Sequence, residues 1–573
     1  MKRCPTCHRA ESDDSLTFCR TDGTPLVISS PQSSELGTVR FDGASAELAT
    51  SLLQQATAAN IGRTTGPTAV LPSPAAATGT RDLPKSKRRW VFIATIVLIV
   101  AMVAVGGFLY VKRKPTPPVI QSIAVMPFIN ESGDANVDYL SDGMTETLIS
   151  SLSQLPNLNV KARSSVFRYK GKETNAQTLG KELNVQAILN GRFAQRADQL
   201  TLTLELVDAL TENVIWSEQY NRPQADLVKL QTDIARDVSS KLRTKLSGTD
   251  EQKLTKTYTR NPEAYKLYLQ GRFYWGKREE KDLTTAIDYF NRAIALDANY
   301  ALAYAGLADS YAVLSGFNFM EPADAVPKAR GYALKAASLD ESLAEPHTTL
   351  GLTLFQYEYD FAGAEKEYKR AIELNPNYAT AHQWYGELLT AIGSFQQADA
   401  EFRRALDLEP LSLPINWDYG RSLYFSRRMD ESLAQHNKTI GLDPGFARAR
   451  RTLVELYRVK KDHAAAIEEM ARYFEVRNQP ENAALVRDTF AKGGWSAYLQ
   501  LVVAEDSPLK ERHWPRAKAY LELGDMDKAI SELNAGYDAH ESTLNWLKVE
   551  PLLDPLRSDP RFQELMRKVR FPE

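Results

Sequence analysis

The sequence predicts a multidomain, mainly α-helical protein: an α-solenoid of helix hairpins, a mixed α/β domain, one transmembrane helix and a small zinc-binding head. Three observations predict it. The second half of the 573-residue chain repeats itself at intervals of about 34 residues, which is typical of stacked helix pairs. A run of 22 residues without a charge lies near residue 100, and all three cysteines fall within the first 19 residues.

The composition excludes several classes of protein. The chain has 70 Lys and Arg residues against 72 Asp and Glu residues, a formal net charge of −2, so no overall basic field attracts nucleic acid and we expect no nucleic-acid partner. Hydrophobic residues make up 43% and charged residues 25%, which are ordinary globular values. At roughly 150 residues per domain, the length predicts about four structural units.

Residues 1–23 predict a metal-binding head. Cys4 and Cys7 are separated by two residues, and Cys19 precedes Asp22 at the same spacing, as in a pair of zinc knuckles. Zinc takes four N, S or O ligands, so the three thiolates and Asp22 form one candidate set, with His8 as the alternative fourth ligand. Because so short a segment cannot bury a core, bound metal would stabilise it. The predicted cofactor is therefore a structural Zn²⁺ ion.

The stretches CPTCHR and FCRTDGTPL in this head resemble the short zinc ribbons found on many bacterial membrane proteins. Asp22 departs from the usual fourth cysteine, which leaves the fourth ligand open. Residues 24–84 contain six prolines and a single aromatic residue, Phe41. This segment cannot offset its chain entropy by burial, so we expect a disordered linker.

Residues 90–111 predict a transmembrane helix, because 22 uncharged residues span about 33 Å as a helix. We therefore expect contact with a lipid bilayer. Five basic residues precede the segment and three follow it, which favours a cytoplasmic amino terminus. Free thiols also suit a reducing compartment. The predicted location is the bacterial inner membrane, crossed once, with the carboxy-terminal domains in the periplasm.

Residues 119–247 predict a mixed α/β domain. Leu200, Leu202, Leu204 and Leu206 alternate with polar residues, the period of a half-buried strand, and helical periodicity occurs on both sides of this strand. The stretches SIAVMPFINESGDANVDYLSDGMTETLISSL and LTLELVDALTENVIWSEQYNR resemble the TolB amino-terminal-like domain. That resemblance implies a noncatalytic periplasmic module.

Residues 260–479 predict about six helix hairpins. Leu-acid or Leu-Asn markers such as Leu374-Asn375 and Leu408-Glu409 recur at intervals of 34 to 43 residues, with small residues at fixed offsets. The pattern Tyr304/Leu307/Ala308/Tyr311 resembles the tetratricopeptide repeat (TPR). Residues 480–573 predict a further helix pair, a degenerate repeat and a carboxy-terminal cap.

The TPR resemblance implies a concave face, formed by the first helix of each repeat, that binds peptides or partner proteins. By repeat position, the inward-facing residues of the later repeats offer aromatic rings and a basic cluster suited to an acidic peptide. The alternative is a solvated face packed by arginine stems. The predicted partner-binding residues are Gln383, Glu387, Trp417, Arg421, Tyr424, Arg448, Arg451 and Arg458.

No phosphate-binding glycine loop, HExxH motif or GxSxG motif occurs, and no cysteine lies beyond residue 19. We therefore expect no enzymatic activity. The predicted function is a membrane-anchored protein-interaction adaptor or scaffold, with a homo-oligomer as an open alternative to a monomer. The alternative is a signalling sensor that relays periplasmic binding to a cytoplasmic partner through the zinc head.

Overall fold

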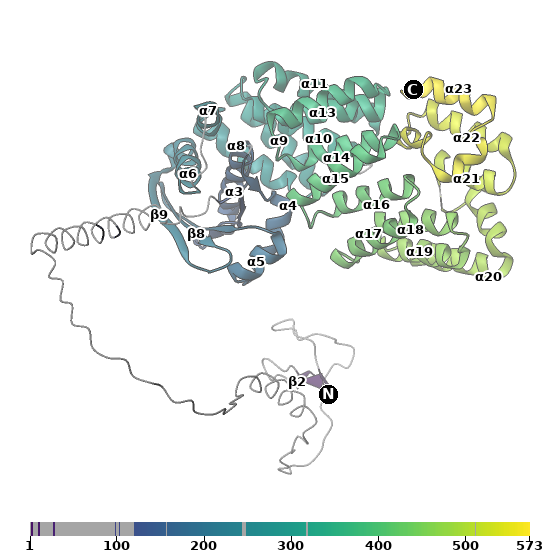
Figure 1. Ribbon diagram of the computed structural model, residues 1–573, viewed down its shortest axis with the longest axis horizontal. Coiled ribbons are helices and arrows are strands. Elements are labelled where there is room, and N and C mark those ends of the chain that lie inside the picture. The colour runs from purple at the N-terminus through teal and green to yellow at the C-terminus, as the bar shows by residue number, and fades with distance from the viewer. Residues whose placement is uncertain are drawn as a thin grey trace, which may run out of the picture. The chain divides into compact units, whose positions relative to one another are not determined.

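The structure is a computed structural model that divides into two compact units, residues 1–113 and 114–573, and each is considered by itself (Figure 1). It describes residues 2–3, 10–11, 27–28, 98, 102, 120–155, 157–242, 248–316, 319–509 and 511–572.

The described residues of the first unit include three short antiparallel strands. Strand β1 (Lys2–Arg3) pairs with β2 (Ala10–Glu11) and with β3 (Val27–Ile28). The predicted zinc ligands Cys4, Cys7, His8, Cys19 and Asp22 lie outside the described residues. The zinc site, the zinc ribbon and the disordered linker therefore stay predictions.

The predicted membrane location is contradicted. Within the residues that the structure describes, no helix is both long enough and apolar enough to cross a bilayer. The location so corrected is a single pass through the bacterial inner membrane, with a cytoplasmic amino terminus and periplasmic carboxy-terminal domains. The predicted span, residues 90–111, lies outside the described residues except for Leu98 and Met102.

The second unit begins with a mixed sheet in the order β6-β4-β7-β8-β9, with β5 also paired to β7. Strands β4, β5 and β6 run parallel to their neighbours, whereas β7, β8 and β9 form an antiparallel meander. The strands are β4 (Ser122–Val125), β5 (Ile129–Asn130), β6 (Asn159–Val160), β7 (Ala187–Arg196), β8 (Gln199–Asp208) and β9 (Val214–Pro223). The predicted small sheet region is confirmed.

The alternation of leucines in β8 buries one face of the sheet. Leu200, Leu202, Leu204 and Leu206 are fully buried, and the polar residues between them lie on the opposite face. Helices α3 (Asp138–Ser153) and α6 (Leu227–Lys241) pack with this domain, and α5 (Ala176–Leu183) lies beside β7. One continuous core joins the sheet to the first helices of the solenoid.

Six helix hairpins follow, and they confirm the mainly helical TPR-like solenoid (Figure 1). The first helices are α8 (Pro262–Trp275), α10 (Ala301–Gly316), α12 (Ala344–Thr353) with η4 (Leu354–Glu358), α14 (Ala379–Ala391), α16 (Leu413–Phe425) and α18 (Ala447–Val459). The second helices are α9 (Glu280–Leu296), α11 (Pro322–Leu339), α13 (Phe361–Leu374), α15 (Phe395–Leu408), α17 (Met429–Leu442) and α19 (His463–Val476).

The recurring glycines allow the two helices of a hairpin to approach each other closely. A Cβ atom at Gly351 would lie 2.6 Å from the Tyr368 ring, and one at Gly386 would lie 3.0 Å from the Phe402 ring. Both rings are fully buried. A larger residue at either glycine would therefore displace a core aromatic ring.

The carboxy-terminal segment turns back onto the middle of the solenoid. It comprises α20 (Pro480–Val503), α21 (His513–Glu522), α22 (Met526–Asp538), η5 (Ser542–Trp546), η6 (Pro551–Leu556) and α23 (Pro560–Val569). Trp546 stacks on Phe425 at a centroid distance of 4.8 Å and lies edge-on to Phe355 at 6.2 Å. The Tyr424 hydroxyl donates to Glu550 at 2.5 Å. This carboxy-terminal segment, called the cap below, thus packs against the third hairpin (α12 and α13) and the fifth hairpin (α16 and α17).

The α/β domain contacts the turns of the later repeats. Asn377, between α13 and α14, places its Nδ2 atom 2.8–3.0 Å from the backbone carbonyl oxygens of Ser153, Leu155 and Leu158. The buried Lys161 side chain donates to the carbonyl oxygen of Asp407. These contacts bridge more than 200 residues of sequence and seat the domain on one edge of the solenoid.

Candidate partner-binding cavity

A cavity of about 1480 Å³ runs along the inner face of the repeats. The first helices α8, α10, α12, α14, α16 and α18 all contribute to its wall. Helices α3 and α4 (Arg163–Val166) of the α/β domain line one part, and α21 and η5 of the carboxy-terminal segment line another. The repeats therefore supply the inner face, and the segments before and after them enclose it.

The lining combines aromatic rings with balanced charge. Five of the eight tryptophans of the chain line the cavity, and so do eleven Lys or Arg residues and eleven Asp or Glu residues among the described ones. Aromatic side chains offer large contact areas at a low cost in conformational entropy. The tryptophans are Trp275, Trp384, Trp417, Trp514 and Trp546.

Seven of the eight predicted partner-binding residues line this cavity. They are Gln383, Glu387, Trp417, Arg421, Tyr424, Arg448 and Arg451. The eighth, Arg458, is not among the lining residues: it is 5% exposed and pairs with Glu455 at 3.0 Å and Glu522 at 2.7 Å. Its role in the structure is to join α18 to the cap.

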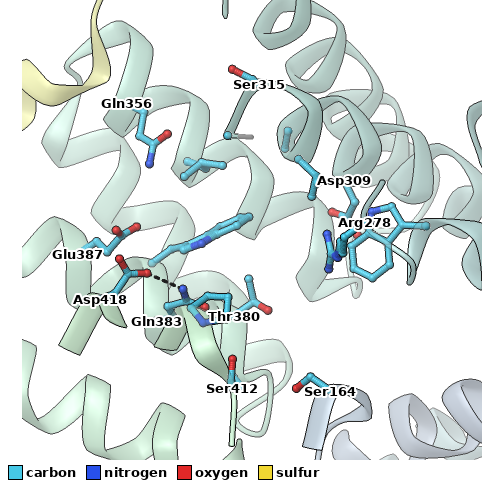
Figure 2. A pocket seen from close by; sticks show the side chains of 18 of the residues that line it. Ser164, Arg278, Asp309, Ser315, Gln356, Thr380, Gln383, Glu387, Ser412 and Asp418 are labelled. Atoms are coloured by element: carbon cyan, nitrogen blue, oxygen red, sulfur yellow. Dashed lines mark hydrogen bonds between the residues drawn. The ribbon is translucent and has the colours of Figure 1, made fainter. Parts of the chain in front are cut away.

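Two buried carboxylates meet in the wall formed by α14 and α16. Arg421 pairs with Glu387 and, at 3.0 Å, with Asp418. The Gln383 amide also donates to Asp418 at 2.7 Å, as Figure 2 shows. Burial and the neighbouring Asp418 carboxylate raise the pKa of Glu387 well above its usual range. The charged groups of this part of the wall thus have their partners within the chain.

The remaining predicted residues are also engaged within the chain. The Trp417 indole N–H donates to Thr452 at 2.9 Å, and Arg448 donates to the carbonyl oxygen of Gly316 at 2.8 Å. Arg451 pairs with Glu511 at 2.7 Å. The predicted basic cluster is therefore largely neutralised by acidic residues of the same chain.

Sequence reasoning missed the charged residues at the opposite end of the cavity. There Glu146 of α3 accepts from Arg272 of α8 and from Arg163 at 3.0 Å, and Arg272 also lies 3.5 Å from Asp309 of α10. Arg272 and Asp309 could have been found by extending the repeat register to the first two hairpins. Glu146 could not, because nothing in the sequence relates the α/β domain to the inner face of the repeats.

Arg278 lies at this same end, just beyond the end of α8 (Figure 2). Its guanidinium carbon is 3.5 Å from the centroid of the Trp275 ring, and that of Arg272 is 4.0 Å from the same centroid. Burial, followed by the charge of Arg272, lowers the pKa of Arg278 to about 10.

Within the described residues, no cluster of His, Cys, Asp and Glu could hold a metal ion.

The helix hairpins form a solenoid around the cavity, and part of this solenoid matches a known repeat family. The tetratricopeptide-repeat model matches residues 353–412, which confirms the predicted repeats. Residues 120–237 match the second domain of HilA/YgeH-like transcriptional regulators. The family match in this region is thus not to the TolB amino-terminal-like domain that we expected.

Among curated proteins, "Putative adenylate cyclase 3" of Rhizobium meliloti (strain 1021) is 32% identical over 250 residues. The match covers 43% of this chain and 42% of the relative, so less than half of the relative is represented. Its name is that of an enzyme, which contradicts the prediction that the chain has no enzymatic activity.

Several solved structures of repeat proteins are similar in part. YrrB, described as a TPR protein with an unusual peptide-binding site, is 20% identical with a TM-score of 0.25, and the match covers 35% of this chain and 97% of YrrB. PilW, a type IV pilus biogenesis factor, is 18% identical with a TM-score of 0.32, covering 39% of this chain and 98% of PilW. The pilF protein of Pseudomonas aeruginosa is 17% identical with a TM-score of 0.26, covering 46% and 99%.

Proposed function

We propose that this protein is an interaction adaptor whose enclosed cavity binds an extended segment of a partner protein. TPR proteins bind peptide or protein partners, and the cavity lies along the first helices of six consecutive hairpins. That continuous inner surface is the observation that carries the proposal.

The size and chemistry of the cavity favour a peptide over a small metabolite. Its volume of about 1480 Å³ exceeds the range of roughly 300–1,000 Å³ that is typical of small-molecule pockets. Aromatic rings such as Trp384 and Trp417 can contact apolar side chains, while amide and hydroxyl groups such as Gln356 and Thr380 can bond to a peptide backbone. Such a mixed lining suits an extended chain with both kinds of group.

Filling the cavity tests this proposal. We expect Thr380→Trp, on the cavity wall at α14, to abolish capture of the partner that the full-length wild-type chain enriches from extracts of its source cells, as measured by quantitative mass spectrometry. Glu373→Trp, on an exposed position of the neighbouring second helix α13, is the matched control and should retain the partner. Equal capture by the wild type and Thr380→Trp would place the binding site elsewhere.

A second candidate function comes from the relative named as an adenylate cyclase. We infer from the name of this relative that the chain is a candidate for nucleotide cyclisation. Incubating the full-length chain with ATP and Mg²⁺ or Mn²⁺ and measuring cyclic AMP tests the activity directly. Cyclic AMP formation no faster than in a protein-free control would remove this candidate.

A further inference from the structure

One arginine of the cavity wall stands apart from the others. Within the described residues, Arg278 is the lining arginine whose guanidinium makes no ion pair and no side-chain hydrogen bond; its guanidinium lies over the face of Trp275. The other lining arginines each bond to a carboxylate, a carbonyl oxygen or a hydroxyl group. Resting on the proposed function, we infer that Arg278 receives an aspartate or glutamate carboxylate of the bound segment.

The backbone holds Arg278 in a conformation that glycine favours. Its φ angle is 62°, in the left-handed region, and the corresponding turns of two other hairpins carry Gly393 and Gly524 with φ angles of 86° and 85°. A side chain in this region costs conformational energy that glycine avoids. This turn nevertheless carries an arginine, whose planar guanidinium can bind a carboxylate through two parallel hydrogen bonds.

A second arginine at an equivalent turn shows what this position can do. Arg427, just beyond α16, has a φ angle of 66°, and its guanidinium lies 2.9 Å and 3.0 Å from the two carboxylate oxygens of Asp554. It also donates to the Val549 carbonyl oxygen at 2.6 Å. Here the carboxylate comes from a distant segment of the same chain. At Arg278 no described segment supplies one, so the position remains open to a carboxylate from a partner.

The charges around Arg278 favour an incoming anion. Arg272 and Arg163 lie beside the same turn: Arg272 shares the Trp275 ring, and Arg163 approaches Gly276 so closely that a Cβ there would lie 2.7 Å from its guanidinium. The carboxylates whose charge reaches Arg278 are already engaged, since Asp309 bonds to Thr349 at 3.0 Å and Glu409 bonds to Ser164. Glu146 pairs with Arg272 and Arg163, and Asp309 pairs with Arg272, but neither makes an ion pair with Arg278, so an incoming carboxylate would give this guanidinium its own counter-charge.

A hydroxyl group of the cavity wall can help to complete the coordination of a carboxylate. Thr380 lines the cavity and is drawn with Arg278 in Figure 2, whereas Ser164 and Ser412, which also line it, already bond to Glu409. A carboxylate can accept about four hydrogen bonds, so a guanidinium fork leaves positions that hydroxyl donors can fill. The guanidinium of Arg278 therefore favours an oxyanion over an apolar group.

Selection from a random peptide library tests the inference on the full-length chain. We expect the wild type to select displayed dodecapeptides enriched in Asp and Glu, and we expect Arg278→Gln to lose that enrichment and to bind the selected peptides roughly tenfold more weakly. Arg278→Lys should retain part of the preference because it keeps the charge. Arg427→Gln is the matched control: it removes an arginine from an equivalent turn, and the acidic preference should persist.

The outcomes separate the two proposals. Acidic enrichment that survives in Arg278→Gln, or selection by the wild type without acidic enrichment, would overturn the inference while the cavity remains a peptide site. Selection that is unchanged in Thr380→Trp, or a library that yields no binder, would overturn the proposed function and the inference that rests on it. Thermal melting of each variant, compared with the wild type, verifies that the fold is retained.

Discussion

The two ends of the cavity use the same residue types in different ways. At the end formed by α16, α18 and the cap, the charged side chains Arg421, Arg451 and Arg458 are joined to carboxylates of the same chain. At the end formed by α8 and the α/β domain, Arg278 lies over the Trp275 ring and makes no ion pair among the described residues. A concave array of arginines is therefore not in itself a binding site, because ion pairs formed when the solenoid closes can neutralise its charges.

The largest loss of stability should come from removing a side chain that joins the cap to the repeats. Trp546 is 7% exposed, stacks on Phe425 and lies beneath the Arg421 guanidinium at 4.4 Å. Trp546→Ala should lower the free energy of unfolding by about 3–5 kcal/mol, because it removes a large buried ring from the interface. Urea unfolding followed by circular dichroism measures the change. Leu210→Ala, at a side chain that is 75% exposed, should change it by no more than about 0.5 kcal/mol.

A smaller loss should follow at the opposite end, where the α/β domain is seated. Asn377→Ala removes the amide that bonds to three carbonyl oxygens at and just beyond the end of α3, and it should lower the free energy of unfolding by about 2 kcal/mol. Hydrogen exchange should show faster exchange at the end of α3. Asn299, which occupies the same place in an earlier turn and is exposed, provides the control Asn299→Ala, and similar losses in both variants would contradict the account.

The paired and unpaired arginines can be compared directly. Arg427→Gln should lower the free energy of unfolding by about 1 kcal/mol, since its half-exposed pair with Asp554 is partly screened by solvent. Arg278→Gln should lower it by only about 0.5 kcal/mol, because the cation–π contact with Trp275 is lost but no ion pair or hydrogen bond is. A large loss of stability in Arg278→Gln would mean that this side chain serves the fold and not a partner.

The buried carboxylates at the cap end predict a pH dependence. Because the pKa of Glu387 is raised in the folded protein, the folded state holds this proton more tightly than the unfolded state, and stability falls as pH rises above the unfolded value of about 4.5. We expect Glu387→Gln to flatten this fall between pH 4.5 and 8 in urea titrations at successive pH values. Identical slopes for the two proteins would contradict the assigned shift.

The repeats could be predicted from the sequence because their cause is local. Small residues such as Gly351 and Gly386 recur where helices touch, and the leucines of β8 alternate along a single strand. Whether each cavity arginine is paired with a carboxylate could not be predicted in this way, because its partners lie far away in the sequence. Arg458 pairs with Glu522, 64 residues later, and Arg427 with Asp554, 127 residues later. Pairings at such distances depend on how the solenoid closes, which the repeat pattern does not encode.

Site-specific photo-crosslinking tests the central claim most directly. A photoreactive phenylalanine analogue placed at Thr380, on the cavity wall, should crosslink a partner protein in living source cells, whereas the same group at the exposed Glu373 on α13 should not. Mass spectrometry of the crosslinked product should locate the attachment within one extended segment of the partner. Crosslinks that form at Glu373 and not at Thr380 would contradict binding in the cavity.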